Sequence, residues 1–276
     1  MRIASILLAG LLLLAACGSS EVASPVERSV AATSMPPTTS EAVSITLAAE
    51  QIRAAEAFAN AVANLLEAPG VRVEYQGLEE GYQTNGWVEQ DLSTGEYRAG
   101  EDEQYDTGQR IVSEYVLVGS DIHARLAHTG EQVEDLDWSV APLSSELRTQ
   151  FVDEALTMSG RAGASLVRIG DYLETLPAEV ADLGGRSDSD RPQRGYQVAF
   201  QAADIARYLR EQRLELVGPS DPDGRSFYEF WVDEGSGALV ELVVAGVQFH
   251  DGEAIDGFGG EISYAVADVI VTTPTE

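Results

Sequence analysis

The sequence predicts an α+β domain, in which one curved antiparallel β-sheet carries helices on one face. Three observations lead to this fold class. A helical repeat occupies residues 46–70, short segments of alternating polar and apolar residues fill 71–127, and helical repeats at 143–176 precede further alternating segments. Runs of strands interrupted by a block of helices favour one antiparallel sheet with helices on one side over a parallel α/β architecture.

The first sixteen residues predict a signal peptide. Arg2 gives a positive start, residues 3–14 are apolar, and Ala15-Ala16 precede Cys17, the single cysteine of the chain. The apolar stretch is shorter than a membrane-spanning helix requires, and small residues before a cleavage point are typical of secretory signals. Leu14-Ala15-Ala16-Cys17 resembles the lipobox of bacterial lipoproteins, which implies lipidation of Cys17 and cleavage before it. An ordinary secretory signal with an accidental cysteine is the alternative interpretation.

Residues 17–45 predict the lipidated cysteine followed by a disordered tether. The segment is rich in Ser, Thr, Ala and Pro and has scarcely any large apolar residue. Such a segment cannot bury enough apolar surface to fold, and as a flexible coil it would hold the domain on the order of 30 Å from the membrane. Residues 46–276 are then expected to form a single domain, since neither a repeat nor a second linker divides them.

The segment "TLAAEQIRAAEAFANAVANLLEAPG" predicts the first helix, which Ser44 or Thr46 can cap and which Pro69-Gly70 ends. Helical spacing predicts a buried stripe of Ile52, Ala55, Ala59, Val62 and Leu66, widened by Phe58 and Leu65.

A series of short strands follows this helix. In "VRVEYQG" the side chains of Val71, Val73 and Tyr75 alternate with polar ones, and four further segments, "GWVEQDL", "GEYRAGED", "QRIVSEYVLVG" and "DIHARLA", are separated by Gly, Asp and Ser turns. Alternation of this kind is typical of antiparallel strands with one polar face.

Two helices and a closing set of strands complete the domain. "SSELRTQFVDEALTM" places Leu147, Phe151, Ala155 and Met158 on one face, and "ASLVRIGDYLETL" does the same for Leu166, Ile169, Leu173 and Leu176. The strand "RGYQVAF" and the short helix "AADIARYLREQ" come next, and the strands "SFYEFWVDE", "ALVELVVAGVQF" and "EISYAVADVIVT" end the chain. Glu234-Gly235-Ser236-Gly237 predicts a hairpin turn between the first two of these.

The charge of the chain excludes one large class of partners. The net charge is −29 at pH 7, and all 17 basic residues are arginine. Such a surface argues against nucleic acid, whose phosphates need basic residues, and it repels an anionic bilayer. Membrane attachment is therefore expected through acyl chains on Cys17. The acidic exterior suits either plain solubility or a cation-rich, salt-adapted surface.

No residue pattern in the chain predicts catalysis, a metal or a cofactor. His123, His128 and His250 have no spacing that brings two of them onto one helix face, and a single cysteine cannot build a zinc site. Residues 160–165 lack the lysine of a phosphate loop, and the acidic loops at 221–224 and 251–256 lack the length and final glutamate of a calcium-binding EF-hand. The acidic pairs Glu79-Glu80 and Asp135 with Asp137 could serve as hydrolytic carboxylates, but in a chain with 46 acidic residues such pairs do not indicate catalysis. A non-enzymatic protein is expected.

The order of the segments resembles a known family. The resemblance rests on "VLVGSDIHARL" followed by Trp138, on "FWVDEGSGALVELVV", and on the final strand "ISYAVADVIV" with Pro274 beyond it. Over residues 45–275 the chain is similar to the LolA-like bacterial lipoprotein carriers and, more closely, to the LppX/LprG-type envelope lipoproteins of actinobacteria. The resemblance implies a half-barrel whose concave face, covered by helices, encloses an apolar cavity for acylated lipids. The high acidity departs from what the family leads one to expect.

The expected function is therefore that of an envelope lipoprotein, anchored through Cys17 on the extracytoplasmic side of the cell membrane, that binds or carries a hydrophobic lipid or acylated glycolipid. Strand alternation gives candidate wall residues, which are Val73, Tyr75, Tyr115, Leu117, Trp231, Leu242 and Val244. The helices give candidate lid residues, which are Leu147, Phe151, Met158, Ile169 and Leu173, with Gly160 and Gly163 as a hinge. The same side chains would also serve as packed core. The alternative function is an anchored interaction or sensor module with a filled core, which binds an envelope protein.

Overall fold

The computed structural model describes residues 47–79, 81–156, 166–188, 191–212, 223–250 and 253–274. These residues belong to one compact unit, Ile45–Glu276. The signal peptide, Cys17, the tether, Met158 and the two hinge glycines at 160 and 163 lie outside the described residues.

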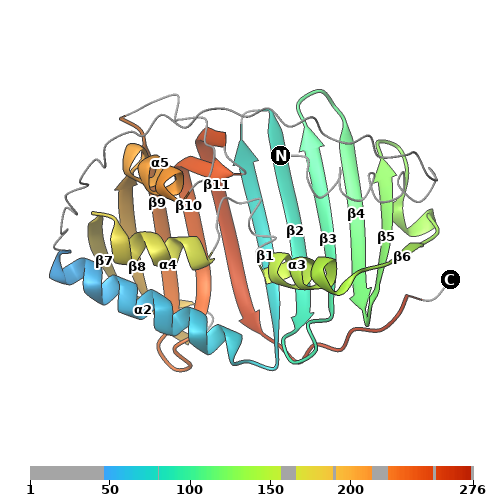
Figure 1. Ribbon diagram of the computed structural model, residues 1–276, viewed down its shortest axis with the longest axis horizontal. Helices are drawn as coiled ribbons and strands as arrows, with labels where there is room; N and C mark the ends of the chain where they lie inside the picture. Colours follow the sequence, from blue (N-terminus) through green and yellow to red (C-terminus); the bar gives the residue numbers. More distant parts are fainter. Residues whose placement is uncertain are drawn as a thin grey trace, which may run out of the picture. The chain divides into compact units, whose positions relative to one another are not determined.

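The described residues form one antiparallel sheet and a set of helices (Figure 1). The helices are α2 (Ala49–Leu66), α3 (Ser145–Leu156), α4 (Leu166–Thr175) and α5 (Ala202–Glu211), with a 3-10 turn η1 at Val133–Asp135. The strands are β1 (Gly70–Glu79), β2 (Tyr82–Asp91), β3 (Tyr97–Tyr105), β4 (Arg110–Val118), β5 (Asp121–His128), β6 (Ser139–Pro142), β7 (Glu179–Asp188), β8 (Arg191–Gln201), β9 (Arg225–Asp233), β10 (Leu239–His250) and β11 (Glu253–Val266). The predicted α+β fold class is confirmed.

The sheet consists of two meanders joined along one seam. Its strand order is β6-β5-β4-β3-β2-β1-β11-β10-β9-β8-β7. Strands β1–β6, here called the N-terminal half, and strands β7–β11, the C-terminal half, each pair in chain order, and β1 pairs with β11 to join them. Among the described strands, the β1–β11 seam, where Val73 lies opposite Tyr264, is the only pairing between strands that are not consecutive in the chain.

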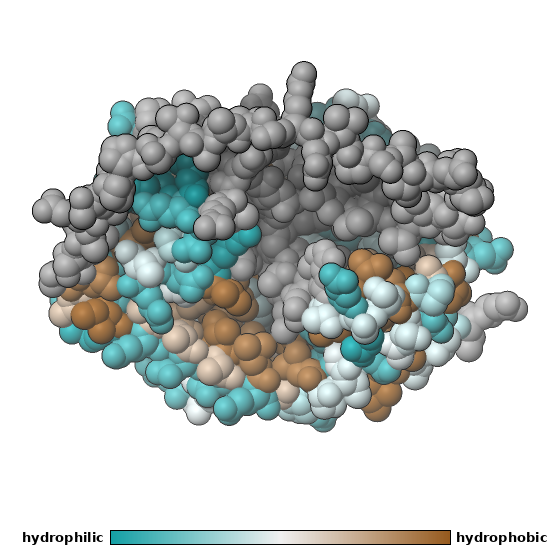
Figure 2. Space-filling model, viewed as in Figure 1, coloured by the Kyte–Doolittle hydropathy of each residue, from teal (hydrophilic) through white to brown (hydrophobic). Residues whose placement is uncertain are grey.

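The helices lie on one face of the sheet, which we call the inner face (Figure 1). Helix α2 contacts β7, β9 and β10, α5 contacts β8 and β10, and α4 packs on α2. Helix α3 instead contacts β2 and β3. Of the described helices, three thus pack over the C-terminal half and one packs over the N-terminal half. Figure 2, which views this side, shows apolar side chains gathered along α2 and α4.

The buried stripe of α2 is shifted by one position from the predicted stripe, although Phe58 and Leu65 are buried as predicted. Ile52 and Leu66 are 46% and 47% exposed, while the buried side chains are Gln51, Ala54, Phe58, Ala61 and Leu65. The buried polar side chain of Gln51 explains the rotation, because its amide joins α2 to the end of α4. The Nε2 of Gln51 donates to the carbonyl oxygens of Leu173 (2.8 Å) and Leu176 (2.6 Å), and its Oε1 accepts from the backbone N–H of Ala178 (3.1 Å).

The turn between β9 and β10 forms as predicted. The Oδ1 of Asp233 accepts hydrogen bonds from the backbone N–H groups of Gly235 (2.9 Å) and Ser236 (2.6 Å), which lowers the pKa of that carboxyl. Gly237 adopts a φ of 69°, a left-handed conformation that favours glycine. The turn fixes the register in which Leu242 lies opposite Phe230 on the inner face.

Candidate functional site

The inner face of the C-terminal half is filled by aromatic side chains. Phe230 of β9 contacts Phe58 of α2 edge-on, with ring centroids 5.0 Å apart, and stacks on Tyr196 of β8 at 5.2 Å. A second group joins Tyr172 of α4 to β8, β9 and α5 through Phe200 (6.0 Å) and Tyr208 (5.6 Å), and Phe200 contacts Tyr228 (5.9 Å). Aromatic pairs at these distances pack favourably beyond their area burial. This half has a continuous core.

Three tyrosines of this core, Tyr172, Tyr208 and Tyr228, have raised pKa values, which favour their neutral form. Burial raises the pKa of Tyr172 to about 12 from an ordinary value of 10.0. Burial likewise raises the pKa of Tyr228 and of Tyr208, and for Tyr208 the neighbouring Asp171 adds to the effect. Desolvation disfavours the charged form of a phenol, so the shifts follow from the dense packing.

The inner face of the N-terminal half carries one row of mostly small side chains, next to a row with the larger buried side chains of Tyr97, Leu117 and Ile122. One cross-strand row runs through Val73, Val88, Ala99, Tyr115 and Ala124. All five are buried, and two of them are alanines. A row of valine and alanine fills less space above a sheet than the phenylalanines and tyrosines of the other half.

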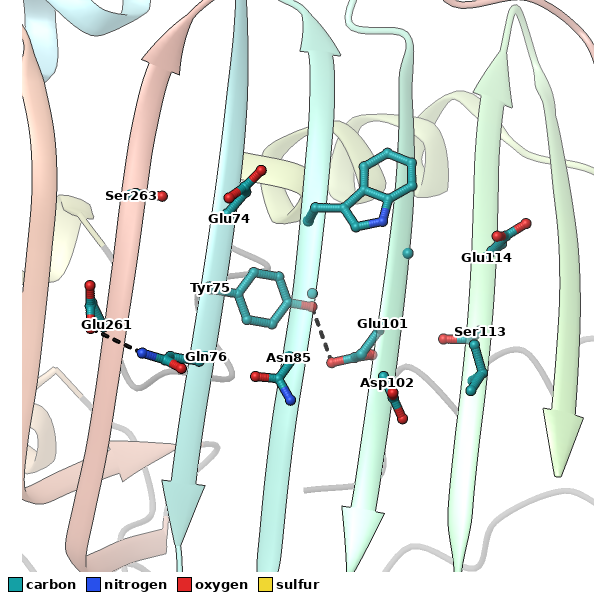
Figure 3. A pocket seen from close by; sticks show the side chains of 14 residues that line it. Glu74, Tyr75, Gln76, Asn85, Glu101, Asp102, Ser113, Glu114, Glu261 and Ser263 are labelled. Carbon is teal, nitrogen blue, oxygen red and sulfur yellow. Dashed lines mark hydrogen bonds between the residues drawn. The ribbon is translucent and has the colours of Figure 1, made fainter. Parts of the chain in front are cut away.

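A polar row lies beside this apolar row. Tyr75, Gly86, Glu101 and Ser113 are cross-strand neighbours, and the Tyr75 ring lies across Gly86, where a Cβ would approach it to 2.4 Å. The Tyr75 hydroxyl donates to Glu101 Oε1 (3.2 Å), as Figure 3 shows, and the Thr84 hydroxyl lies at the same distance from that oxygen. Glu101 is only 4% exposed, so a carboxyl group sits on the buried side of the sheet.

Strand β3 carries a pattern that could have predicted this polar row and that the sequence analysis above does not use. In "EYRAGEDEQY" the residues on the face of Tyr97 and Ala99 continue as Glu101 and Glu103, two acids at positions that alternation assigns to the interior. Both are buried. Acidic side chains are rarely buried, and an apolar alternation that continues into acids indicates a polar site on the inner face.

Helix α3 covers one end of the N-terminal half. The amide of Gln90 donates to the carbonyl of Val152 (3.2 Å), and Arg148 donates to the carbonyls of Gly119 (2.7 Å) and Thr94 (2.8 Å). The Oε1 of Gln90 is buried without a hydrogen-bond partner among the described residues. Polar contacts to strand β2 and to two turns therefore help to hold this helix to the sheet.

The structure divides the predicted lipid-contacting residues between the two halves. Val73, Tyr75, Tyr115 and Leu117 lie on the inner face of the N-terminal half, and Leu147 and Phe151 are half-buried on α3. Leu242 and Val244 lie on the inner face of β10, next to Phe230 and Tyr228. Ile169 and Leu173 are buried on α4 in the filled C-terminal half. The predicted residues therefore do not form one wall.

Trp231 must be removed from the predicted inner wall. It follows Phe230, which points to α2, so its own side chain lies on the opposite face, here called the outer face. There its ring covers Gly195 of β8, and the guanidinium of Arg186 lies 3.8 Å above the ring while pairing with Glu241. Two consecutive aromatic residues in a strand cannot both face the core, and the identity of the residues does not say which one does.

A groove of about 500 Å³ lies on the outer face of β11, β1, β2, β3 and β4, as seen in Figure 3. Its side chains come from the positions that alternate with the inner rows, among them Glu74, Gln76, Asn85, Trp87, Asp102 and Glu261. We call it the outer groove. Sequence reasoning did not identify it, because its residues are ordinary polar positions of a strand and become a site only through cross-strand register.

Two features are absent from the described residues. No group of three or more His, Cys, Asp or Glu residues there is placed to hold a metal ion. None of the described helices combines the length and apolar character that crossing a membrane would require.

The architecture is similar to that of two mycobacterial proteins. The lipoprotein LppX of Mycobacterium tuberculosis matches at 11% identity and a TM-score of 0.45, covering 80% of this chain and 99% of that chain. LprF of Mycobacterium bovis matches at 11% identity and a TM-score of 0.47, covering 82% of this chain and 98% of that chain. No family model and no curated protein sequence matches the chain. The likeness concerns the fold alone.

Proposed function

We propose that the protein is an envelope lipoprotein that binds or carries a hydrophobic, acylated lipid on the inner face of its N-terminal half. The observation that carries this proposal is the contrast between the two halves. In the C-terminal half aromatic rings of β8 and β9 contact those of α2 and α4, whereas one inner row of β1–β5 contains valines and alanines beside Tyr115, and α3 covers one end of this half. An acyl chain would take the space above the small side chains.

The proposed binding needs no energy source. Burying one methylene group contributes roughly 0.8 kcal/mol whether the group enters a bilayer or an apolar protein site. Transfer of a chain between the two is therefore close to neutral in free energy. The side chains of Val73, Val88 and Ala99 are apolar and 0–2% exposed, so a bound acyl chain would replace the contacts that now bury this row.

The polar row beside the apolar row would hold the head group of the lipid. Glu101 already accepts hydrogen bonds from hydroxyl groups, those of Tyr75 and Thr84. A lipid whose head group carries hydroxyl groups, such as an acylated glycolipid, would find the same kind of acceptor. The role proposed is one of binding, with no reaction assigned to these residues.

The test is mass spectrometry of lipids that co-purify with residues 17–276 carrying Cys17→Ser, prepared without detergent. We expect a lipid in stoichiometric amount. A protein that carries no lipid and takes up no acyl probe would favour the alternative of an anchored interaction module with a filled core, which the packing of the C-terminal half already resembles.

Anchoring through Cys17 belongs to the same proposal. Because two acyl chains are about what durable attachment needs, Cys17→Ser should release the protein into the medium or leave an uncleaved precursor. Fractionation and intact-mass measurement distinguish these outcomes from the wild type. A Cys17→Ser protein that stays membrane-bound and is processed like the wild type would contradict the lipoprotein assignment.

A further inference from the structure

The outer groove lies on the side of the sheet opposite the proposed lipid site and has its own chemistry. Its rim and floor come from five adjacent strands, and its volume of about 500 Å³ lies within the range of roughly 300–1,000 Å³ that small-molecule sites occupy. Figure 3 shows the side chains of Glu74, Gln76, Asn85 and Glu261 among those that line it.

The carboxylates of the groove are largely neutralised in place. Glu74 pairs with Arg72 (2.8 Å), Asp102 pairs with Arg110 through two hydrogen bonds of 2.8 Å, and Glu114 pairs with Arg125. Glu261 accepts a hydrogen bond from the amide of Gln76 (3.0 Å). With Glu101 included, five carboxylates line the groove, and three of them are paired with arginine, so the groove is polar without being a strong cation site.

An indole forms part of the wall. The ring of Trp87 lies against Gly100 of β3, where a Cβ would come within 2.6 Å of the ring nitrogen, so the glycine is what allows the ring to lie down on the sheet. The guanidinium of Arg98 lies 5.9 Å from the ring centre. A half-buried indole beside amides and carboxylates combines an apolar surface with planar hydrogen-bonding groups.

We infer that the outer groove binds a segment of a neutral saccharide. Sugar rings present C–H faces, which pack on an indole, and hydroxyl groups, which both donate and accept. Amides such as those of Asn85 and Gln76, together with carboxylate–arginine pairs, supply both kinds of partner. A neutral ligand fits the neutralised carboxylates better than a cationic one does. The groove also borders on Tyr75, Glu101 and Ser113 of the polar row, so the two proposed sites share the strands between them.

The test measures saccharide binding by the full-length lipidated protein, kept in a detergent without sugar groups. The probes are neutral oligosaccharides of glucose, mannose, galactose and arabinose, titrated by calorimetry. At least one should bind the wild type. Trp87→Ala should weaken that binding about tenfold, which corresponds to about 1.4 kcal/mol.

The chain offers a matched control in Trp231. This residue also lies on the outer face over a glycine, Gly195, with an arginine beside its ring, but it is outside the groove. Trp231→Ala should leave saccharide binding unchanged. If Trp87→Ala does not fold, the double variant Gln76→Ala with Asn85→Ala replaces it, and it too should weaken binding.

Three outcomes would overturn the inference. Wild-type protein could bind no saccharide of the panel. Trp87→Ala and Trp231→Ala could weaken binding equally, which would indicate a general loss of structure. A hexalysine peptide could bind in place of the saccharides and lose its affinity in Glu261→Gln, which would make the groove a site for cationic peptides.

Discussion

The two halves of the sheet have the same construction and different interiors. Each is an antiparallel meander, and their inner faces are continuous across the β1–β11 seam. In the C-terminal half a cross-strand row contains Val198, Tyr228 and Val244, with α2, α4 and α5 above it. In the N-terminal half the row contains Val73, Val88, Ala99, Tyr115 and Ala124. The two rows differ in the alanines of the N-terminal half and in the helices that cover them, while the antiparallel topology is the same.

Placing the same large side chain in each half should show the largest difference between them. Val88 and Val198 are both buried valines on the inner face. Val198→Trp should lower the free energy of unfolding by about 1–3 kcal/mol, because a tryptophan beside Tyr228 overpacks a filled core. Val88→Trp should cost clearly less and should abolish lipid binding. Urea unfolding and lipid mass spectrometry measure the two effects.

Equal destabilisation by the two substitutions, with no lipid in the wild type, would show that the N-terminal half is as solid as the other. The comparison would then fail, and with it the proposed lipid site. If the Val88→Trp protein still binds its lipid, the ligand must lie elsewhere than on this row.

A smaller effect should follow from alkaline pH, which acts on the filled half. The pKa of Tyr172 is raised from 10.0 to about 12 in the folded state, so between these values the unfolded chain loses a proton that the folded chain keeps. The stability that this proton provides is complete below pH 10.0 and is lost as the pH rises towards about 12. The free energy of unfolding should fall by about 1.4 kcal/mol per pH unit for this group.

Tyr172→Phe is the control for the alkaline effect, because it keeps the ring and removes the titrating hydroxyl. The slope of stability against pH in urea unfolding should become smaller, while Tyr208 and Tyr228, whose pKa values are also raised, keep part of it. A variant with an unchanged slope would show that Tyr172 is not held neutral by the packing.

Most of the fold could be predicted because alternation and helical spacing are local properties. Val73 and Tyr75 were assigned to the same face, and they share it. The stripe of α2 could not be placed correctly, since the hydrogen bonds of Gln51 to the end of α4 join segments more than a hundred residues apart. Tertiary contacts of this kind override the local preference of Ile52 for burial.

The sites were less predictable than the fold. The assignment of Trp231 failed because Phe230 and Trp231 are both suitable for a core, and only the contact of Phe230 with Phe58 decides between them. The outer groove depends on register, which brings Gln76 opposite Glu261 and Trp87 opposite Gly100. No sequence pattern in a single strand carries that information.

The central claim, that a lipid lies on the inner face of the N-terminal half, is tested most directly by photocrosslinking. A fatty acid with a diazirine group at its chain end is bound to residues 17–276 carrying Cys17→Ser, irradiated, and located by peptide mass spectrometry. We expect labelled peptides from β1–β4, residues 70–118, and competition by the co-purified lipid. Labelling confined to β8–β10, residues 191–250, or labelling that the lipid does not displace, would contradict the claim.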